Sequence, residues 1–169
     1  AIKLATDLID NFQNIYEDKW LNMMRDKLGL FGEDKNDKKL INDLFDWMEK
    51  NKADYTNTFC YLMNKLEIND KIYKDQEFLN WEEKWKVRLK YKNQSLEKSL
   101  LVMKESNPII IPRNHIVEES INLAAEKNDM SKIFQMLNVI KNPMKYNSDV
   151  SNYQKKPNSR KKYVTYCGT

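Results

Sequence analysis

Residues 107–119 read NPIIIPRNHIVEE, and this stretch decides how the rest of the chain must fold. Pro108 and Pro112 bracket three consecutive isoleucines. Proline lacks a backbone N–H donor and pushes the residue before it toward extended backbone, so the residues preceding both prolines should not be helical. We therefore expect a short, buried, extended connector around which the flanking helices pack. Asn114 is the expected N-cap of the helix that follows.

Apolar residues recur at spacings of three and four through most of the remaining sequence, which is the pattern of amphipathic helices. The expected helices span residues 3–28, 37–51, 55–66, 76–92, 94–105, 115–127 and 131–141. Polar residues at three of the expected starts are predicted to be caps: Asp37, Asp54 or Thr56, and Asp129 or Ser131. No alternating strand pattern appears. The predicted fold class is all-α, an irregular bundle of about seven helices.

Residues 142–169 lack this periodicity and are predicted to form an irregular, basic C-terminal tail. The sequence is therefore divided into a helical domain over residues 1–141 and a tail over residues 142–169. Five cations fall between Lys155 and Lys162, and a solvated segment is the simpler interpretation of such a run. The alternative is a surface that holds phosphates or an acidic partner.

The composition fits one domain with its own core, since the 169 residues are 41% hydrophobic and 32% charged with a net charge of +4. No apolar run approaches the roughly 20 residues that a membrane span needs. Two cysteines do not make a disulfide framework, so a reducing compartment is expected and the predicted location is cytoplasmic. The chain begins at Ala1, which we expect of a processed protein or of a segment from a longer one.

Three neighbouring residues could carry chemistry, but each has a simpler structural interpretation. His115 is the only histidine; it could be a general base or metal ligand, yet no partner stands at ligand spacing. Arg113 and Asn114 could hold an anion at a helix N-terminus. Arg113 could equally pair with a carboxylate such as Glu118, or cover the open carbonyls of another helix. We predict structural or interface roles for all three.

The tryptophans and cysteines also have both a functional and a structural interpretation. Trp81 and Trp85, one helical turn apart, could stack on a base or a ligand, but this spacing is more typical of a core. Cys60 lies beside Phe59 on an expected helix and is interpreted as a small buried filler. Cys167 is close to the C-terminus, where an exposed thiol can exchange with a distant partner, although exposure alone does not make a thiol reactive.

Motifs for catalysis are missing from the sequence. With only three glycines there is no glycine-rich phosphate loop, and no Ser/His/Asp order or metal constellation is visible. Adjacent acidic pairs such as Glu82–Glu83 point apart on a helix and do not form an acid/base dyad. We therefore predict no catalytic, cofactor-binding or metal-binding residue, and the chain does not read as a complete enzyme.

Several blocks, taken in order, resemble the C-terminal part of the selenoprotein O family, the pseudokinase-fold protein adenylyltransferases. The blocks are MRDKLGL at 24–30, DYTNTF at 54–59, NP at 107–108, IPRNH at 111–115, VEE at 117–119 and CGT at 167–169. The W-x3-W-x2-RL pattern over residues 81–89 and the Ala124–Ala125 pair followed by Asp129 also fit. Each block is weak alone, and the signal comes from their common order.

The resemblance implies a full-length enzyme that binds ATP and Mg²⁺ or Mn²⁺ in an N-terminal kinase-like domain and transfers AMP to Ser, Thr or Tyr hydroxyls of acceptor proteins. This segment would pack on that domain and be inactive alone. In the family, the position of Cys167 is a cysteine or selenocysteine that can form a redox-linked disulfide with the kinase-like domain. Cys60 departs from the family, because many relatives have arginine there.

A different class of function fits the residues without the resemblance. The chain could be a free-standing helical interaction module that binds an acidic partner or nucleic acid through its basic tail. The two hypotheses differ in where the chemistry happens, because the first places it in a domain outside this chain.

Overall fold

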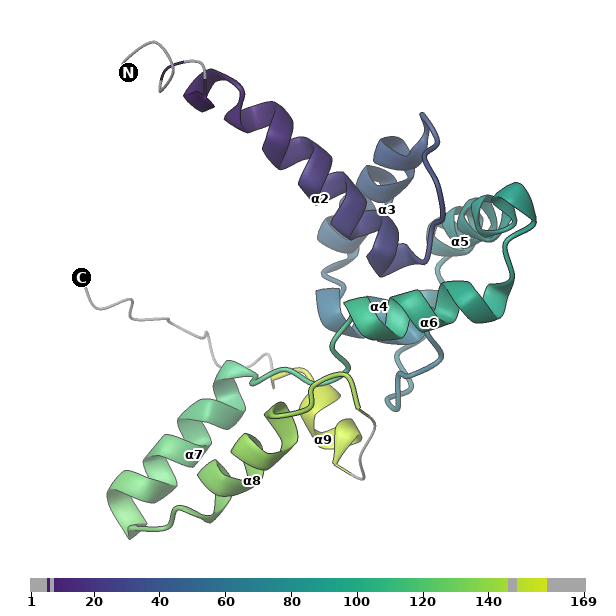
Figure 1. Ribbon diagram of the computed structural model, residues 1–169. Helices are drawn as coiled ribbons and strands as arrows, with labels where there is room; N and C mark the ends of the chain where they lie inside the picture. The colour runs from purple at the N-terminus through teal and green to yellow at the C-terminus, as the bar shows by residue number, and fades with distance from the viewer. Residues whose placement is uncertain (1–5, 7, 146–148, 158–169) are drawn as a thin grey trace.

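The computed structural model describes residues 6, 8–145 and 149–157, and these residues form helices joined by short loops (Figure 1). The elements, in order, are α2 (Phe12–Leu28), α3 (Asp37–Asn51), α4 (Tyr55–Leu62), η1 (Lys71–Lys74), α5 (Gln76–Leu89), η2 (Tyr91–Asn93), α6 (Leu96–Ser106), α7 (Asn114–Lys127), α8 (Ser131–Ile140) and α9 (Val150–Gln154). No strand occurs in these ranges, and the predicted all-α class is confirmed.

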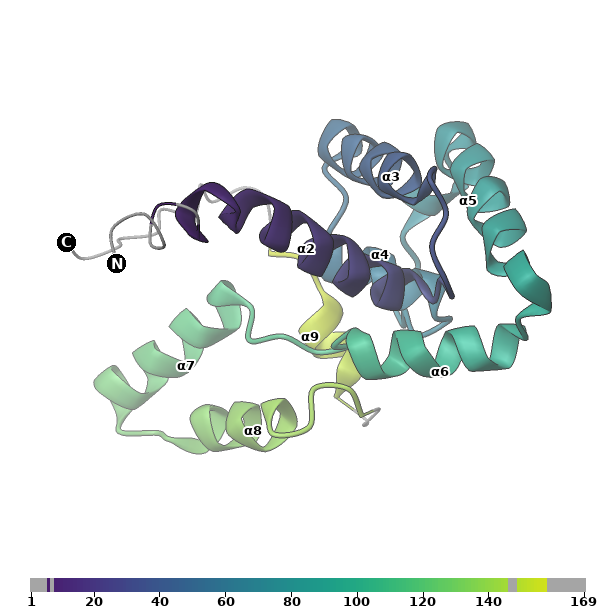
Figure 2. The same ribbon diagram turned by 45° about the horizontal axis from the view of Figure 1, so that its top comes forward.

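The main body is built from α2, α3, α5 and α6. Helix α2 packs on α6 and α3, while α3 packs on α5 (Figure 2). Aromatic rings fill its centre: the rings of Trp47 and Phe78 lie 4.5 Å apart, and those of Tyr73 and Phe78 lie 5.4 Å apart. Such offset and tilted pairs add to the stabilisation from burial alone.

Trp81 and Trp85 are buried in this core, as predicted, and each indole N–H has a partner. The Nε1 of Trp81 donates to the carbonyl of Leu40 at 2.8 Å, and the Nε1 of Trp85 donates to the carbonyl of Leu28 at 2.9 Å. These bonds tie α5 to α2 and α3. Neither tryptophan is available to stack on a ligand.

The proline-bracketed connector is extended and buried, as predicted. Asn107 leaves α6 with φ −126° and ψ 120°, and Ile109 and Ile110 are buried while Ile111 is only partly so. The amide of Asn107 donates to the carbonyls of Lys27 and Met103, at 2.8 and 2.9 Å. The connector is therefore fixed to the ends of both α2 and α6.

The predicted helix starts were partly wrong. Asp54 is the N-cap of α4, as expected, and its side chain accepts the N–H of Asn57 at 2.9 Å. Helix α7, however, begins at Asn114 with Arg113 in the N-cap position and no side-chain cap, so Asn114 is not the N-cap. The residue at which a helix begins can shift by one or two positions with the definition used. Here, however, no side-chain hydrogen bond caps the N-terminus of α7.

The other two predicted caps also differ. Helix α3 has Asn36 at its N-cap, because the carboxylate of Asp37 is used by distant arginines instead of by its own helix. Helix α8 has Met130 at its N-cap, although Asp129 does accept the N–H of Ser131 at 2.9 Å.

An irregular structure from residue 142 onward was also predicted, and over α9 this was wrong. Val150, Tyr153 and Gln154 are buried. The side chain of Gln154 accepts the N–H of Glu67 and donates to the carbonyl of Lys65, both at 2.8 Å. A five-residue helix that buries a glutamine has no recognisable apolar period, which explains the error. The division of the chain into a helical domain over residues 1–141 and a tail over residues 142–169 stays a prediction.

Gly29 ends α2 in the left-handed conformation, with φ 66°, and a Cβ there would lie 2.8 Å from the carbonyl oxygen of Ser99. We expect Gly29→Ala to lower the free energy of unfolding by about 2–4 kcal/mol, because the left-handed backbone alone costs about 1–2 kcal/mol and the contact adds to it. Urea unfolding measures this. Gly32→Ala, at an exposed site with φ 65°, should show the backbone cost only. Equal losses for both variants would contradict the close contact.

Candidate functional site

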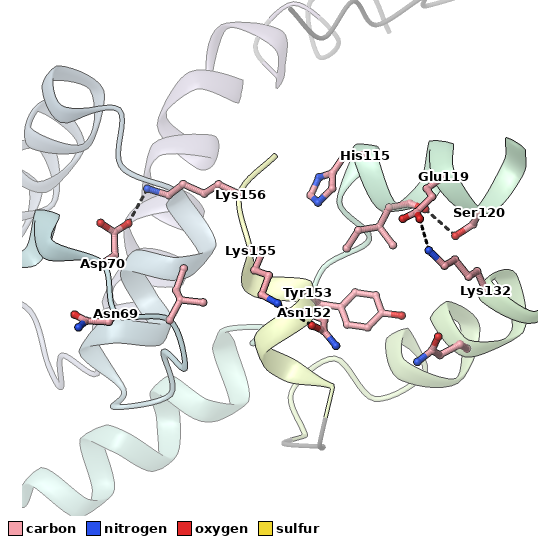
Figure 3. A pocket seen from close by; sticks show the side chains of 13 residues that line it. Asn69, Asp70, His115, Glu119, Ser120, Lys132, Asn152, Tyr153, Lys155 and Lys156 are labelled. Carbon is pink, nitrogen blue, oxygen red and sulfur yellow. Dashed lines mark hydrogen bonds and ion pairs between the residues drawn. The ribbon is translucent and has the colours of Figure 1, made fainter. Parts of the chain in front are cut away.

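A groove of about 790 Å³ lies between the loop before η1, the start of α7, α8 and α9 (Figure 3). Its walls come from segments far apart in sequence. Its polar lining residues are Asn69, Asp70, His115, Glu119, Ser120, Lys132, Gln135, Asn152, Lys155 and Lys156. The groove is the natural place to look for ligand chemistry.

The lysine side chains of the groove each have an ion-pair or hydrogen-bond partner in the groove. Lys156 pairs with Asp70 at 2.8 Å, and Lys132 forms an ion pair with Glu119 (Figure 3). The Nζ of Lys155 donates to the side-chain oxygen of Asn152 at 3.0 Å. Because these cations already have acceptors, the groove does not present the cluster of unpaired positive groups that would hold a phosphate.

His115 lies on the wall of this groove and is partly exposed (Figure 3). Its ring makes no hydrogen bond to another described residue, and no carboxylate or thiol cluster surrounds it. Asn114, one residue earlier, is exposed on the first turn of α7. The structural or interface roles predicted for these two residues stay predictions.

Arg113 sits behind the groove and is buried. Its Nε donates to the carbonyl of Tyr153 at 2.5 Å, and its Nη1 and Nη2 contact the carboxylate of Asp54 at 2.6 and 3.0 Å. Nη2 also donates to the side-chain oxygen of Asn57 at 3.0 Å. One guanidinium thus joins the connector, the start of α4 and the end of α9. Both structural roles predicted for Arg113 occur together. Its guanidinium pairs with a carboxylate, which is that of Asp54 and not of Glu118, and it donates to an open carbonyl of another helix, that of Tyr153.

The pair between Arg113 and Asp54 is permanently charged near neutral pH. Burial raises the pKa of Asp54, but hydrogen bonds from Arg113 and from the N–H of Asn57 outweigh burial, so the pKa lies below its ordinary value. A carboxylate held ionised in this way cannot donate a proton at neutral pH. The cluster therefore stabilises the fold rather than acting as an acid or a base.

A second buried ion network joins α2, α3 and α5. Asp37 is fully buried, and its two carboxylate oxygens accept from the Nε of Arg25 and the Nε of Arg88, each at 2.7 Å. Arg88 also donates to the carbonyls of Phe31 and Gly32 at 3.1 and 2.9 Å. The sequence analysis missed this network, because 51 residues separate Asp37 from Arg88 and no local pattern joins them.

Cys60 is fully buried in α4, which confirms its interpretation as a small core residue. Burial raises the pKa of its thiol to about 12, and the negative charge of Asp54 adds to the rise. The thiolate is the reactive form, so this thiol is inert at neutral pH. Cys167, the predicted redox residue, lies outside the described residues.

We expect an alkylating reagent at pH 8 to modify Cys60 at least about 100-fold more slowly in the folded protein than in urea-unfolded protein, because the thiol must become both exposed and ionised. Following mass in a Cys167→Ser protein isolates the signal of Cys60. Similar rates in the two states would contradict the buried, protonated thiol.

The described residues offer neither a metal site nor a membrane span. Among the described residues, no group of three or more His, Cys, Asp or Glu side chains is placed to hold a metal ion. The donor set here therefore does not fit a catalytic metal, and no metal-assisted step is assigned to these residues. Over the described ranges, none of the helices combines the length and the apolarity that crossing a membrane requires.

Fold and site together define an all-α domain whose buried polar side chains are used to join its own helices. The chain belongs to the SelO family: the model of protein adenylyltransferase SelO matches residues 2–141. This confirms the resemblance drawn from the sequence blocks. The family consists of protein nucleotidyltransferases, so it is a family of enzymes.

Relatives that carry the name protein nucleotidyltransferase YdiU match along the whole chain. The chain is 48% identical to the protein of Pelagibacter ubique, 44% to that of Clostridium perfringens and 38% to that of Nitrosococcus oceani. Each match covers 100% of this chain but only 34–35% of the relative. The chain thus spans about a third of the length of the curated relatives that it matches.

Proposed function

We propose that this chain is the C-terminal helical part of a protein adenylyltransferase that transfers AMP from ATP to Ser, Thr or Tyr hydroxyls of acceptor proteins. The observation that carries the proposal is the 48% identity over the whole chain to a protein nucleotidyltransferase of which the chain spans 35%. ATP and Mg²⁺ or Mn²⁺ would bind in a kinase-like domain outside this chain.

The reaction needs groups that this chain does not supply. The acceptor oxygen attacks the α-phosphorus of ATP, a bond forms between them, the bond from that phosphorus to the bridging oxygen breaks, and pyrophosphate leaves. The hydroxyl proton goes to a base, and cations hold the departing charge. The buried and partly buried carboxylates described here are used internally, by Asp37 with two arginines and by Asp54 with Arg113. This use supports a non-catalytic role for the chain.

The role we assign is architectural and regulatory. The helical domain packs on the kinase-like domain of the same protein, and its C-terminus presents Cys167 as a redox-sensitive thiol. Disulfide formation would join Cys167 to a cysteine of that domain, with two electrons and two protons passing to an external disulfide such as oxidised glutathione. We expect the whole protein to act in the cytoplasm.

The test uses the full-length protein with an acceptor protein and ATP labelled either at the α- or at the γ-phosphate. We expect label to enter protein from the α position only, in the presence of Mg²⁺ or Mn²⁺. Label entering from the γ position would show phosphoryl transfer, and label from neither position would remove the proposed activity. Either result would overturn the proposal.

The alternative, an interaction module that uses its basic tail, has less support among the described residues. Lys156 is ion-paired with Asp70, and Lys155 donates to Asn152. A salt-dependent complex with RNA or an acidic protein, lost on truncation after Pro157, would favour this alternative. Truncating there spares Tyr153 and Gln154, which are buried.

A further inference from the structure

Helix α2 has two apolar faces, and only one of them meets the body. The buried face carries Met24 and Leu28, which are 1% and 0% exposed. The other face is solvent-exposed and belongs to the half of the helix that projects beyond the body (Figure 2). We call it the α2 apolar surface; its residues, with their exposed fractions, are Phe12 65%, Ile15 45% and Tyr16 58%. Leu8 and Ile9, just before the helix begins, are also exposed.

The spacing of these residues shows that the surface is a face of its own. Phe12 lies three residues before Ile15 and four before Tyr16, and Met23, also exposed, continues the row one heptad after Tyr16. Met24 and Leu28 lie about 80° and about 120° around the helix from Tyr16, at 3.6 residues per turn. The apolar spacing over residues 3–28 predicted a single amphipathic helix and did not separate these two rows.

The exposure of aromatic side chains to water on a projecting helical segment is energetically unfavourable. Helices shorter than about 12–15 residues are marginal without tertiary contacts. The rings of Phe12 and Tyr16 stack on each other at 6.2 Å, yet both remain more than half exposed. Contiguous exposed apolar side chains on one face mark an interaction surface.

A second exposed apolar region lies on the hairpin formed by α7 and α8. Ile121 and Phe134 are 55% and 59% exposed there. In both ribbon views, the hairpin and the projecting half of α2 extend from the same side of the body (Figures 1 and 2). An occupant that covers both regions would contact this one side of the body.

The lengths of the relatives identify such an occupant. They match all of this chain, so the α2 apolar surface lies within the matched region, and about two-thirds of their own length lies outside the match. We infer that the α2 apolar surface is the docking face for that remaining part of the same polypeptide. The inference rests on the proposed function, because it takes the full-length protein to carry a kinase-like domain. Interfaces that form once and stay closed are apolar in this way.

Hydrogen exchange tests the assignment in the full-length protein, with chain 1–169 as reference. We expect the amides of residues 12–19 to exchange at least about tenfold more slowly in the full-length protein. In the full-length protein, the double variant Phe12→Gln with Tyr16→Gln should return these amides to the rates of the reference, while α5 stays protected. Glutamine is a good helix former, so the change removes apolar surface without breaking α2. Val87→Gln, on an equally exposed valine of α5, is the matched control and should change nothing at α2.

Several results of this exchange experiment would overturn the docking face or the proposed function. Equal exchange of α2 in the two proteins, or no effect of the double variant, would overturn the inference. Protection that already appears in chain 1–169 and grows with its concentration would identify a second copy as the occupant and overturn it too. AMP transfer is measured on the same full-length sample. Protected α2 amides without AMP transfer would refute the proposed function and leave this docking face standing, whereas transfer with unprotected α2 would refute the docking face alone.

Discussion

Replacing Arg113 with alanine should lower the free energy of unfolding by about 3–5 kcal/mol, the usual cost of removing one partner from a buried ion pair. The variant leaves the carboxylate of Asp54 without its bidentate partner and the carbonyl of Tyr153 without its donor. It also removes one of the links between three segments, because Arg113 joins the connector to α4 and α9. Few single changes on this chain touch so many elements.

Urea unfolding followed by helical circular dichroism measures this loss. Lys86→Ala is the control, because Lys86 pairs with Glu82 and Glu83 at the surface and such pairs contribute no more than about 1 kcal/mol. The anion-binding alternative is tested by adding phosphate. A structural Arg113 predicts the same phosphate effect on wild type and on Arg113→Ala. A loss below about 1 kcal/mol, or phosphate stabilisation that disappears in the variant, would contradict the structural role.

Replacing Asp37 with asparagine should cost about 3–5 kcal/mol at pH 7, because Arg25 and Arg88 would keep their charges without a buried counter-ion. The variant should also lose part of its acid sensitivity. Burial raises the pKa of Asp37, but the hydrogen bonds from Arg88 and Arg25 outweigh it, so the pKa in the folded protein is lowered.

The sign of the pH effect follows from that lowered pKa. A carboxyl whose pKa is depressed on folding contributes stability that is fully present above its unfolded value, about 3.9, and is lost as the pH falls through the folded value. Wild-type stability should therefore fall in this acidic window, and the Asp37→Asn protein should show a shallower decline. Asp43→Asn, which removes a surface pair with Lys39, is the control and should keep the wild-type slope. Equal slopes for wild type and Asp37→Asn would contradict the assignment.

The apolar period predicted some helix bounds correctly, although the helix expected over residues 3–28 is interrupted at Asn11 and α2 begins at Phe12. Helix α3 spans residues 37–51, as predicted, and the connector around Ile109 and Ile110 is extended and buried. Both features depend on local rules, namely helical periodicity and the backbone restriction at proline. Helix α9 was missed because it is too short to show a period and buries the polar Gln154.

The polar networks could not be predicted, because they depend on long-range contacts. Arg113 was expected to meet a carboxylate, but its partner Asp54 lies 59 residues earlier in the chain. Asp37 was expected to cap its own helix, and instead it binds arginines from two other helices. The groove on which His115 lies has the same origin, since its walls come from separate segments. No local motif carries this information.

We propose that AMP transfer takes place outside this helical chain. The most direct measurement incubates chain 1–169 with α-labelled ATP, Mg²⁺ or Mn²⁺ and acceptor proteins, beside the full-length protein under the same conditions. We expect labelled acceptor protein with the full-length protein and none with chain 1–169. Transfer of label by chain 1–169 alone would contradict it.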